Sequence, residues 1–478
     1  MKQTMHIAEP LFARLAHHLF PGDGDEHGAI FIAGISETPR GTRFLVREVL
    51  LAKDGADYVA GTHGYRALTA GFIARAAHLC GRENLCYFAV HNHGGRDSVA
   101  FSDVDLASQR RGYPALLDIT KGGPVGALVF AQNAVAGKIW RRSGTTDLDS
   151  LTVIGQRFER LFPHPRASYA GVDAMYGRQS LLFGAAGQRL LMQAKVGIIG
   201  LGGVGSLVSQ WLAHLGVGHI VGVDFDFLEP TNRPRVVGAT AWDAGEPFID
   251  SRFAILRWLG KKLARRKVEI AARVACAANK RVHYEPIVGD ITDMATAQRM
   301  TDVDFLFLCA DGMLPRSVFN ALVHQFLIPG VQIGCKVPVE KKTGKVQDVF
   351  LVSRPVLPFP VGGCLSCNDL IPADRLRDEM LTPEDRERQR YVDDEAVAVP
   401  SVITLNALAA AQAVNDFLFG YLGLTSPNAA AGYLMHQPMD RRWRGVDCRA
   451  DKACLMCGIE HDSAYARGDR AVLPCRQG

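Results

Sequence analysis

Short, almost wholly apolar runs punctuate the chain, and each is followed by a polar or glycine-rich segment. Two of them, LCYFAV at residues 85–90 and VDFLFLCADG at residues 303–312, predict buried strands. Residues 196–226 pass from an apolar run through closely spaced glycines into a longer stretch and a second apolar run, which predicts strand, turn, helix and strand. The apolar stretch 405–424 is broken by asparagine, glutamine and aspartate, so it predicts a buried helix and not a membrane span. Together these patterns predict an α/β fold.

The motifs that carry chemistry divide the chain into two parts. A histidine-rich motif lies in the first 142 residues, and the glycine-rich strand–turn–helix lies beyond residue 176. The polar segment at residues 141–150 resembles a linker, so we place the boundary near Ser143. We therefore expect one α/β domain over residues 1–142, a linker and lead-in helix over 143–175, and a Rossmann-like domain over 176–478.

Composition narrows the classes of function. Lys and Arg number 54 and Asp and Glu number 49, for a net charge of +5, without the concentrated basic excess of an obligate nucleic-acid binder. Hydrophobic residues make up 48% and charged residues 22%, which excludes a mainly disordered or fibrous chain. The first twenty residues lack a continuous apolar stretch, so no export signal is expected. We expect a cytoplasmic protein that binds neither nucleic acid nor membrane, with its 11 cysteines as thiols or metal ligands.

The strand predicted at residues 85–90 leads directly into His91 and His93. Residues two apart on a strand point to the same face, so both imidazoles can bind one ion. Ser102 resembles the N-cap of a following helix, and Asp105, one turn in, would face back toward the strand end. Two histidines and one carboxylate leave a fourth zinc position for water, and zinc lowers the pKa of that water to about 7. The alternative is a polar strand end with capping residues.

This motif resembles the JAB/MPN metalloprotease family, whose signature is His-x-His, a short loop and Ser-x-x-Asp. The resemblance implies a metal-dependent isopeptidase domain with His91, His93 and Asp105 as zinc ligands. It also implies Glu26 as the general base and Ser102 as a group that stabilises the tetrahedral oxyanion.

The second motif has the spacing Gly-x-Gly-x-x-Gly, from Gly200, Gly202 and Gly205. Such glycines let the backbone approach a phosphate at a helix N-terminus. Asp224 ends the next predicted strand and can take a pair of ribose hydroxyls. Alone, this pattern suits an NAD-dependent dehydrogenase equally well.

Charged residues farther along favour a triphosphate. Asn232 and Arg235 follow the second strand, and arginine matches phosphate oxygens bidentately. Lys267 lies on a basic helix. Asp311 ends the apolar strand at residues 303–312, where a carboxylate is well placed to hold Mg²⁺ against phosphates.

This set, over about residues 176–457, resembles the ThiF/MoeB family of adenylating enzymes, which includes the ubiquitin-activating enzymes. The resemblance implies a Rossmann-like domain that binds ATP and Mg²⁺, with Asp224 on the ribose and Asp311 on the Mg²⁺. The residues implied for the phosphates are Asn232, Arg235 and Lys267, with Lys261 and Lys262 as alternatives for the lysine. Arg178 would reach the γ-phosphate, in many members from the partner subunit, so we expect a homodimer through the C-terminal domain.

Two Cys-x-x-Cys pairs lie in the same half: Cys364 with Cys367, and Cys454 with Cys457. Four thiolates close a tetrahedral structural zinc site, and the ThiF/MoeB family carries such a pair of pairs. A redox role is the alternative for a single pair. No cysteine lies between residues 368 and 400, where thioester-forming members place their nucleophile, so we expect no thioester in that loop.

Both resemblances point to the C-terminal glycine of a ubiquitin-like protein. The leading hypothesis is a fusion that adenylates this glycine with ATP and, with zinc, processes or deconjugates the same protein, in a prokaryotic ubiquitin-like conjugation system of the kind sometimes associated with antiphage defence. The expected partners are a ubiquitin-like or sulphur-carrier protein and a conjugating enzyme. One alternative is sulphur-carrier activation for cofactor biosynthesis. Others are an NAD-dependent oxidoreductase with an accessory metal domain, and a non-catalytic scaffold with a degenerate JAB fold.

Overall fold

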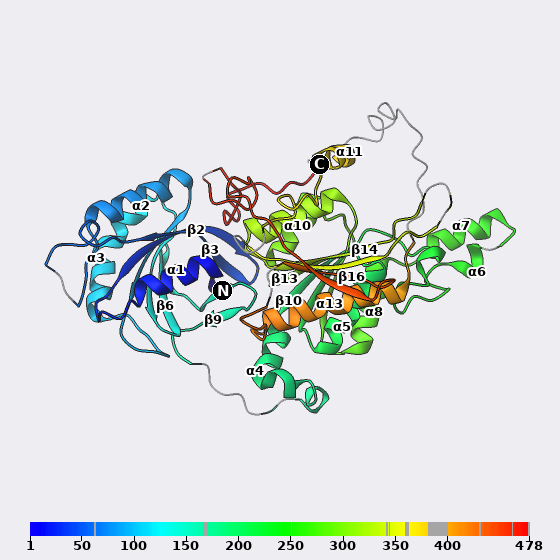
Figure 1. The fold of residues 1–478 in the computed structure, drawn as a ribbon, viewed down its shortest axis with the longest axis horizontal. Helices are drawn as coiled ribbons and strands as arrows, with labels where there is room; N and C mark the ends of the chain where they lie inside the picture. The colour runs from blue at the N-terminus through cyan, green and yellow to red at the C-terminus, as the bar shows by residue number, and fades with distance from the viewer. Residues whose placement is uncertain are drawn as a thin grey trace.

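The computed structural model describes most of the chain, over residues 1–61, 64–165, 171, 173–249, 251–340, 343, 345–358, 363–380, 400–429, 432–460 and 462–476. These residues form one nine-stranded and one eight-stranded sheet, each packed with helices. The N-terminal half lies at the left of Figure 1 and the C-terminal half at the right. The mixed α/β fold predicted from the apolar runs is confirmed.

The first sheet has the strand order β7-β6-β5-β4-β2-β3-β1-β8-β9. Its strands are β1 (Lys2–Ala8), β2 (Gly28–Thr38), β3 (Gly41–Leu51), β4 (Cys86–Asn92), β5 (Val125–Ala131), β6 (Ala134–Arg141), β7 (Gly144–Asp147), β8 (Ser150–Ile154) and β9 (Glu159–Leu161). Its helices are α1 (Glu9–Leu19), α2 (Ala70–Glu83) and α3 (Asp103–Ile119). Neighbours on β2 face opposite sides, since Phe31 packs with α1 while Ile30 and Ile32 pack with α2 and α3.

The segment expected as a linker contributes strands to this sheet. Residues 144–161 form β7, β8 and β9, and β8 pairs with β1 in parallel. The polar sequence near Ser143 is instead the turn between β6 and β7, where Gly144 has a φ of +136°. A turn and a linker share the same polar, glycine-containing composition, so the first sheet extends beyond the boundary expected at Ser143.

The second sheet has the strand order β12-β11-β10-β13-β14-β15-β16-β17. Its strands are β10 (Lys195–Ile199), β11 (His219–Val223), β12 (His283–Ile287), β13 (Phe305–Leu308), β14 (Gly330–Lys336), β15 (Phe350–Val356), β16 (Tyr433–Gln437) and β17 (Arg442–Val446). The first five in the spatial order are parallel and the last three extend the sheet in antiparallel fashion. The predicted strand–turn–helix–strand at residues 196–226 is confirmed as β10, α5 and β11.

Helices cover both faces of this sheet. They are α4 (Ser180–Gln193), α5 (Gly203–Leu215), α6 (Glu246–Ile249), α7 (Ala254–Leu263), α8 (Lys267–Ala278), α9 (Met294–Arg299), α10 (Met313–Gln325), α11 (Ala373–Met380) and α13 (Ile403–Tyr421), with 3₁₀ turns η1 (Ala174–Tyr176), η2 (Pro230–Asn232) and η3 (Met300–Asp302). One core cluster joins α5, α8 and α13 to the sheet, and another joins α9 and α10 to the opposite face. The stretch 405–424 is the buried helix α13, as predicted. Within the described part of the chain, no helix has the length and apolarity needed to cross a membrane.

Two arginines, one half-buried and one buried, join the two halves. Arg40 donates to Asp304 at 2.6 Å and to Asp302 at 3.1 Å. Arg43, on β3, donates to the carbonyls of Thr301 and Val303, both at 3.2 Å. The apolar core is also shared, because Leu45, Ile154 and Phe158 pack in the same cluster as α5 and α13.

A second arginine of β3 holds the C-terminal segment. Arg47 is buried and donates to the carbonyls of Glu460, Ser463 and Tyr465. This segment directly follows the second Cys-x-x-Cys pair, so one side chain of the first half organises a loop of the second.

Replacing Arg47 with alanine should leave these buried carbonyls without their donor. We expect the free energy of unfolding to fall by about 2–3 kcal/mol, measured by chemical denaturation. The matched control is Arg142→Ala, because Arg142 and its partner Asp118 are 68% and 77% exposed, and exposed pairs contribute about 0–1 kcal/mol. Equal losses in the two variants would contradict a stabilising role for Arg47.

Candidate functional sites

Two imidazoles and a carboxylate converge at the end of β4. The Nε2 atoms of His91 and His93 lie 3.2 Å apart, and they lie 3.4 Å and 3.3 Å from the two carboxylate oxygens of Asp105. Ligands at about 2.0–2.1 Å from a tetrahedral ion are themselves separated by about 3.3 Å. The three side chains thus have the spacing that a zinc ion requires, and they are among the groups that could hold a metal.

The start of α3 fixes the carboxylate of this group of possible metal ligands. Ser102 is the N-cap, as expected, and it forms a capping box with Asp105. Burial alone would raise the pKa of Asp105, but hydrogen bonds from His91 and Ser102 hold it well below its usual range. The Ser102 hydroxyl donates to Asp105 at 2.7 Å. The hydroxyl expected to stabilise an oxyanion is therefore engaged in orienting a ligand.

Glu26 lies beside the cluster, at the entry to β2. Its Oε1 is 3.6 Å from Nε2 of His93. The backbone on either side is tied down, since Glu26 N–H donates to the carbonyl of Gly64 at 2.7 Å and His27 N–H donates to the Asn92 side chain at 2.6 Å. Burial raises the pKa of Glu26 above its ordinary value. A partly buried carboxylate of raised pKa is suited to accept and release a proton.

The second site is a cavity of about 630 Å³ at the carboxyl ends of β10, β11 and β13. Its volume lies within the usual range for a cofactor or substrate, roughly 300–1,000 Å³. The predicted site residues that line it are Gly200, Gly202, Asp224, Asn232, Arg235, Lys267 and Asp311. Residues separated by more than 100 positions are thus brought to one edge of the sheet, where ligands bind in open α/β folds.

The three glycines have different structural roles. Gly200 adopts a φ of +88°, which turns the chain out of β10. Gly202 has open space where a side chain would be, so its backbone is accessible to a phosphate. A Cβ on Gly205 would lie 1.9 Å from the carbonyl oxygen of Gly200. Gly205 therefore allows α5 to pack closely against the turn and does not line the cavity.

Asp224 ties the glycine turn to β11. Its carboxylate accepts from the backbone N–H groups of Leu201 at 2.7 Å and Asp226 at 2.8 Å. Burial raises the pKa of Asp224 above its usual value. Asp226 in turn pairs with Nζ of Lys267 at 2.5 Å, which holds that lysine in the cavity. Asp226 was not predicted as a site residue, although its position two residues after Asp224 was a visible signal.

Two further residues of the cavity come from distant segments. Glu379, on α11, accepts from the N–H groups of Met313 and Leu314, both at 2.8 Å, and so caps α10. Arg476 reaches the cavity from the C-terminal tail. Neither had a sequence signal, because only the folded chain brings them close to the glycine turn.

Arg178 lies apart from the cavity that its own chain forms. It follows η1 and precedes α4, and it is not among the described residues that line the cavity. The alternative lysine Lys262 is also outside the lining, since its ammonium lies 4.2 Å above the ring of Trp258. The side chain of Lys261 lies outside the described residues, and among the described lysine side chains Lys267 is the one that lines the cavity.

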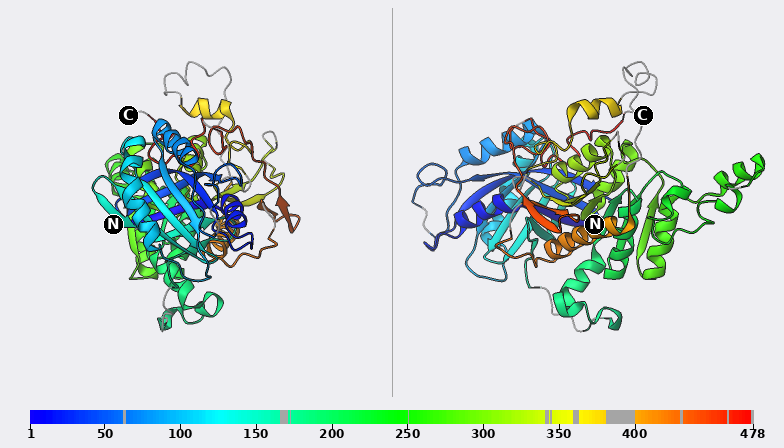
Figure 2. Two further views of the ribbon diagram at one scale, coloured as in Figure 1. Left: turned by 90° about the vertical axis from the view of Figure 1, so that its left-hand side faces the viewer. Right: turned by 45° about the vertical axis from the view of Figure 1, so that its right-hand side comes forward.

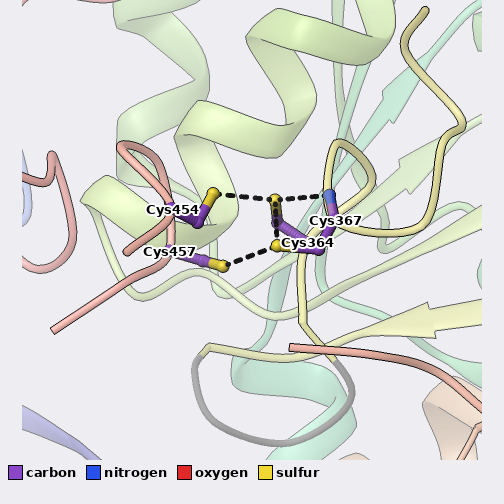
Figure 3. Close-up of side chains that lie close together, drawn as sticks. All are labelled: Cys364, Cys367, Cys454 and Cys457. Carbon is purple, nitrogen blue, oxygen red and sulfur yellow. Dashed lines mark hydrogen bonds between the residues drawn. The ribbon is translucent and has the colours of Figure 1, made fainter. Parts of the chain in front are cut away.

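The four predicted cysteine ligands meet in space. Figure 3 shows the pairs Cys364–Cys367 and Cys454–Cys457 facing each other from two segments of the chain. Their closest Sγ separations are 3.6 Å, 3.7 Å and 3.6 Å. A tetrahedral ion with Zn–S bonds of about 2.3 Å gives sulfur separations of about 3.8 Å. The cysteines therefore form a possible metal site, and none of the chain's cysteines, all of which are described, is in a disulfide.

A third group, His219, His283 and Glu285, also brings possible ligand atoms together. Glu285 is already paired with Arg299 and lies 3.7 Å from Lys195. These two positive side chains lie beside the carboxylate of the group and would repel a divalent cation. The residues are therefore better explained as an ion-pair network.

Comparison with known proteins concerns the second half of the chain. The pattern of the ThiF family matches residues 176–456. Over 286 residues the chain is 24% identical to the "Sulfur carrier protein ThiS adenylyltransferase" of Escherichia coli (strain K12), covering 59% of this chain and 94% of that protein. It is 29% identical over 148 residues to the "Molybdopterin-synthase adenylyltransferase" of the same strain, covering 30% of this chain and 52% of that protein.

The chain thus spans about half the length of this second relative. Among solved structures, Escherichia coli MccB with succinimide has a TM-score of 0.45 and 20% identity, covering 60% of this chain and 75% of that chain. The family match begins at Tyr176, at the end of η1, and ends inside the second Cys-x-x-Cys pair. It covers more than half of the 478 residues, so the chain belongs to the ThiF family.

Proposed function

We propose that the C-terminal half uses ATP and Mg²⁺ to adenylate the C-terminal glycine of a ubiquitin-like or sulphur-carrier protein. The observation that carries the proposal is the single cavity that joins the glycine turn to Lys267 and Asp311. The names of two relatives, adenylyltransferases for a sulphur carrier and for molybdopterin synthase, support the same chemistry. In an NAD-dependent oxidoreductase, Lys267 and Asp311 would have no role in the cavity.

The residues of the cavity divide the work of the reaction. The backbone at Gly202 and the cations Arg235 and Lys267 bind the phosphates, while Asp224 takes the ribose. Asp311 would hold Mg²⁺, which supplies charge neutralisation at the phosphates when bound. An oxygen of the partner's terminal carboxylate bonds to the α-phosphorus, the bond from that phosphorus to the bridging oxygen breaks, and pyrophosphate leaves. Asp226 keeps the Lys267 ammonium at the phosphate end.

We also propose that two copies pair through the C-terminal half. Arg178 lies outside its own cavity, and α4, which follows it, projects from the body in Figures 1 and 2. Leu181 and Leu182, near the start of α4, have side chains that are 88% and 60% exposed. Covering these apolar side chains with a second copy would remove them from water and would bring Arg178 toward the partner's cavity.

For the N-terminal half we propose a zinc-dependent peptidase that processes or deconjugates the same partner. His91, His93 and Asp105 have the spacing to hold the ion, and Ser102 keeps Asp105 oriented. Zinc would supply Lewis-acid chemistry there when bound. Glu26 would take a proton from the attacking water and deliver it to the leaving amine. The convergence of the three ligand atoms supports this over a merely polar strand end.

Lys267→Ala should lower ATP–pyrophosphate exchange in the presence of the partner protein by about 100-fold or more, because a buried cation at the phosphates is lost. Lys262→Ala is the control, since Lys262 stacks on Trp258 outside the cavity. Exchange should stay within about twofold of the wild type in that variant. If exchange were lost in Lys262→Ala and kept in Lys267→Ala, the phosphate-binding lysine would be Lys262 and the proposed role of Lys267 would be wrong.

Glu26→Gln should keep bound zinc but reduce cleavage of a ubiquitin-like conjugate by about 100-fold or more, because the amide cannot take a proton. His91→Ala should instead lower the zinc content by about one ion per chain, measured by elemental analysis, while the cysteine site keeps its own. ATP–pyrophosphate exchange should be unchanged in Glu26→Gln. If both activities fell together, the two sites would not be independent.

The double variant Leu181→Asp/Leu182→Asp should convert a dimer into a monomer in light scattering, because four charges would meet at the proposed interface. Val472→Asp, at an apolar residue that is 83% exposed in the C-terminal tail, should leave the dimer intact. A monomeric wild-type protein would refute the pairing.

A further inference from the structure

The C-terminal tail of the chain returns to the edge of the nucleotide cavity. Arg476 N–H donates to the carbonyl of Thr292 at 2.9 Å, and the residue forms a parallel bridge with Asp293. Leu473, three residues earlier, is 5% exposed and packs in the core cluster of α9 and α10. The backbone of the tail is therefore anchored where Arg476 enters the cavity lining.

The order of the strands identifies the end of the cavity that Arg476 borders. The glycine turn follows β10, Asp224 follows the adjacent β11, and residues 289–292 follow the next strand, β12. In this fold the phosphates lie at the glycine turn and the ribose at the acidic residue after the second strand. The base then extends beyond the ribose, toward residues 289–292. Arg476 is bonded to this loop, which follows β12, two strands away from β10 and its glycine turn.

The side chain of Arg476 is available to a ligand. Its nearest carboxylate, on Asp290, is 3.7 Å away, and the arginine side chain is 53% exposed. An exposed pair at that distance contributes little and does not lock the guanidinium in place. A guanidinium is planar and delocalised, so it stacks on aromatic faces and can also donate to ring nitrogens. Ile291, which also lines the cavity, offers an apolar surface for the same base.

We propose that Arg476 binds the nucleobase of the nucleotide in this cavity. The inference rests on the proposed adenylation function, and it assigns the base end of the site to a tail that lies outside the parallel strands and their loops. The ligand would be a purine nucleotide. The face of its ring would meet the guanidinium, and its phosphates would lie at the glycine turn.

The test compares binding of ATP and AMP by calorimetry, because AMP keeps the base and lacks the β- and γ-phosphates. Arg476→Ala should weaken both ligands by the same factor, about tenfold, as expected for loss of a cation–ring contact. Arg476→Lys keeps the charge without the planar group and should also weaken both. Arg470→Ala is the matched control, since Arg470 is an exposed arginine of the same tail outside the cavity lining. Lys267→Ala serves as the phosphate reference and should weaken ATP much more than AMP.

Two results would overturn the assignment. If Arg476→Ala weakened ATP but not AMP, Arg476 would serve the phosphates, and if it weakened neither, the tail would take no part in binding. Failure of the wild-type protein to bind ATP at all would overturn the adenylation proposal together with this one. The backbone bond to Thr292 does not depend on the side chain, so the variants should fold, which thermal unfolding checks.

Discussion

Guanidinium groups from the turn before β3 and from β3 itself carry the contact between the two halves. Arg40 and Arg43 outweigh the effect of burial and hold the pKa of Asp304 below its usual value. The same carboxylate accepts from the backbone N–H of Lys195 at 2.8 Å, at the first residue of β10. The central strands of the second sheet are thus held at their amino ends by the first half. Their carboxyl ends, which carry the cavity, are left open to ligands.

Inside the cavity, charge is arranged in pairs that hold it in shape without a ligand. Asp224 accepts from two backbone N–H groups, Asp226 pairs with Lys267, and Glu379 accepts from the N-terminus of α10. Each bond links a different segment to the glycine turn or to its neighbours. A ligand that enters the cavity therefore meets groups that are already oriented, which lowers the entropy lost on binding.

The parts of the fold that could be predicted from the sequence are those encoded within a few residues. The His91–His93 spacing, the capping box at Ser102 and the strand–turn–helix at residues 196–226 are local, and their geometry follows from the periods of strands and helices. The two Cys-x-x-Cys pairs were recognisable because four thiolates in two such pairs are typical of a structural metal site. The polar segment near Ser143 is a turn between strands, because turns and linkers have the same composition. Arg47 and Arg476 could not be predicted, since their partners are set only by the docking of distant segments.

Strand β2 connects the pair His91 and His93 to the second half of the chain. Gly28, its first residue, pairs with His91, and the backbone N–H of Glu37, near its other end, donates to the Asp469 carboxylate of the second half at 2.7 Å. Its 11 residues span about 34 Å at about 3.4 Å per residue. An extended peptide would need roughly ten residues to cover that distance. A flexible segment shorter than this therefore cannot reach from the histidine cluster to the second half along β2.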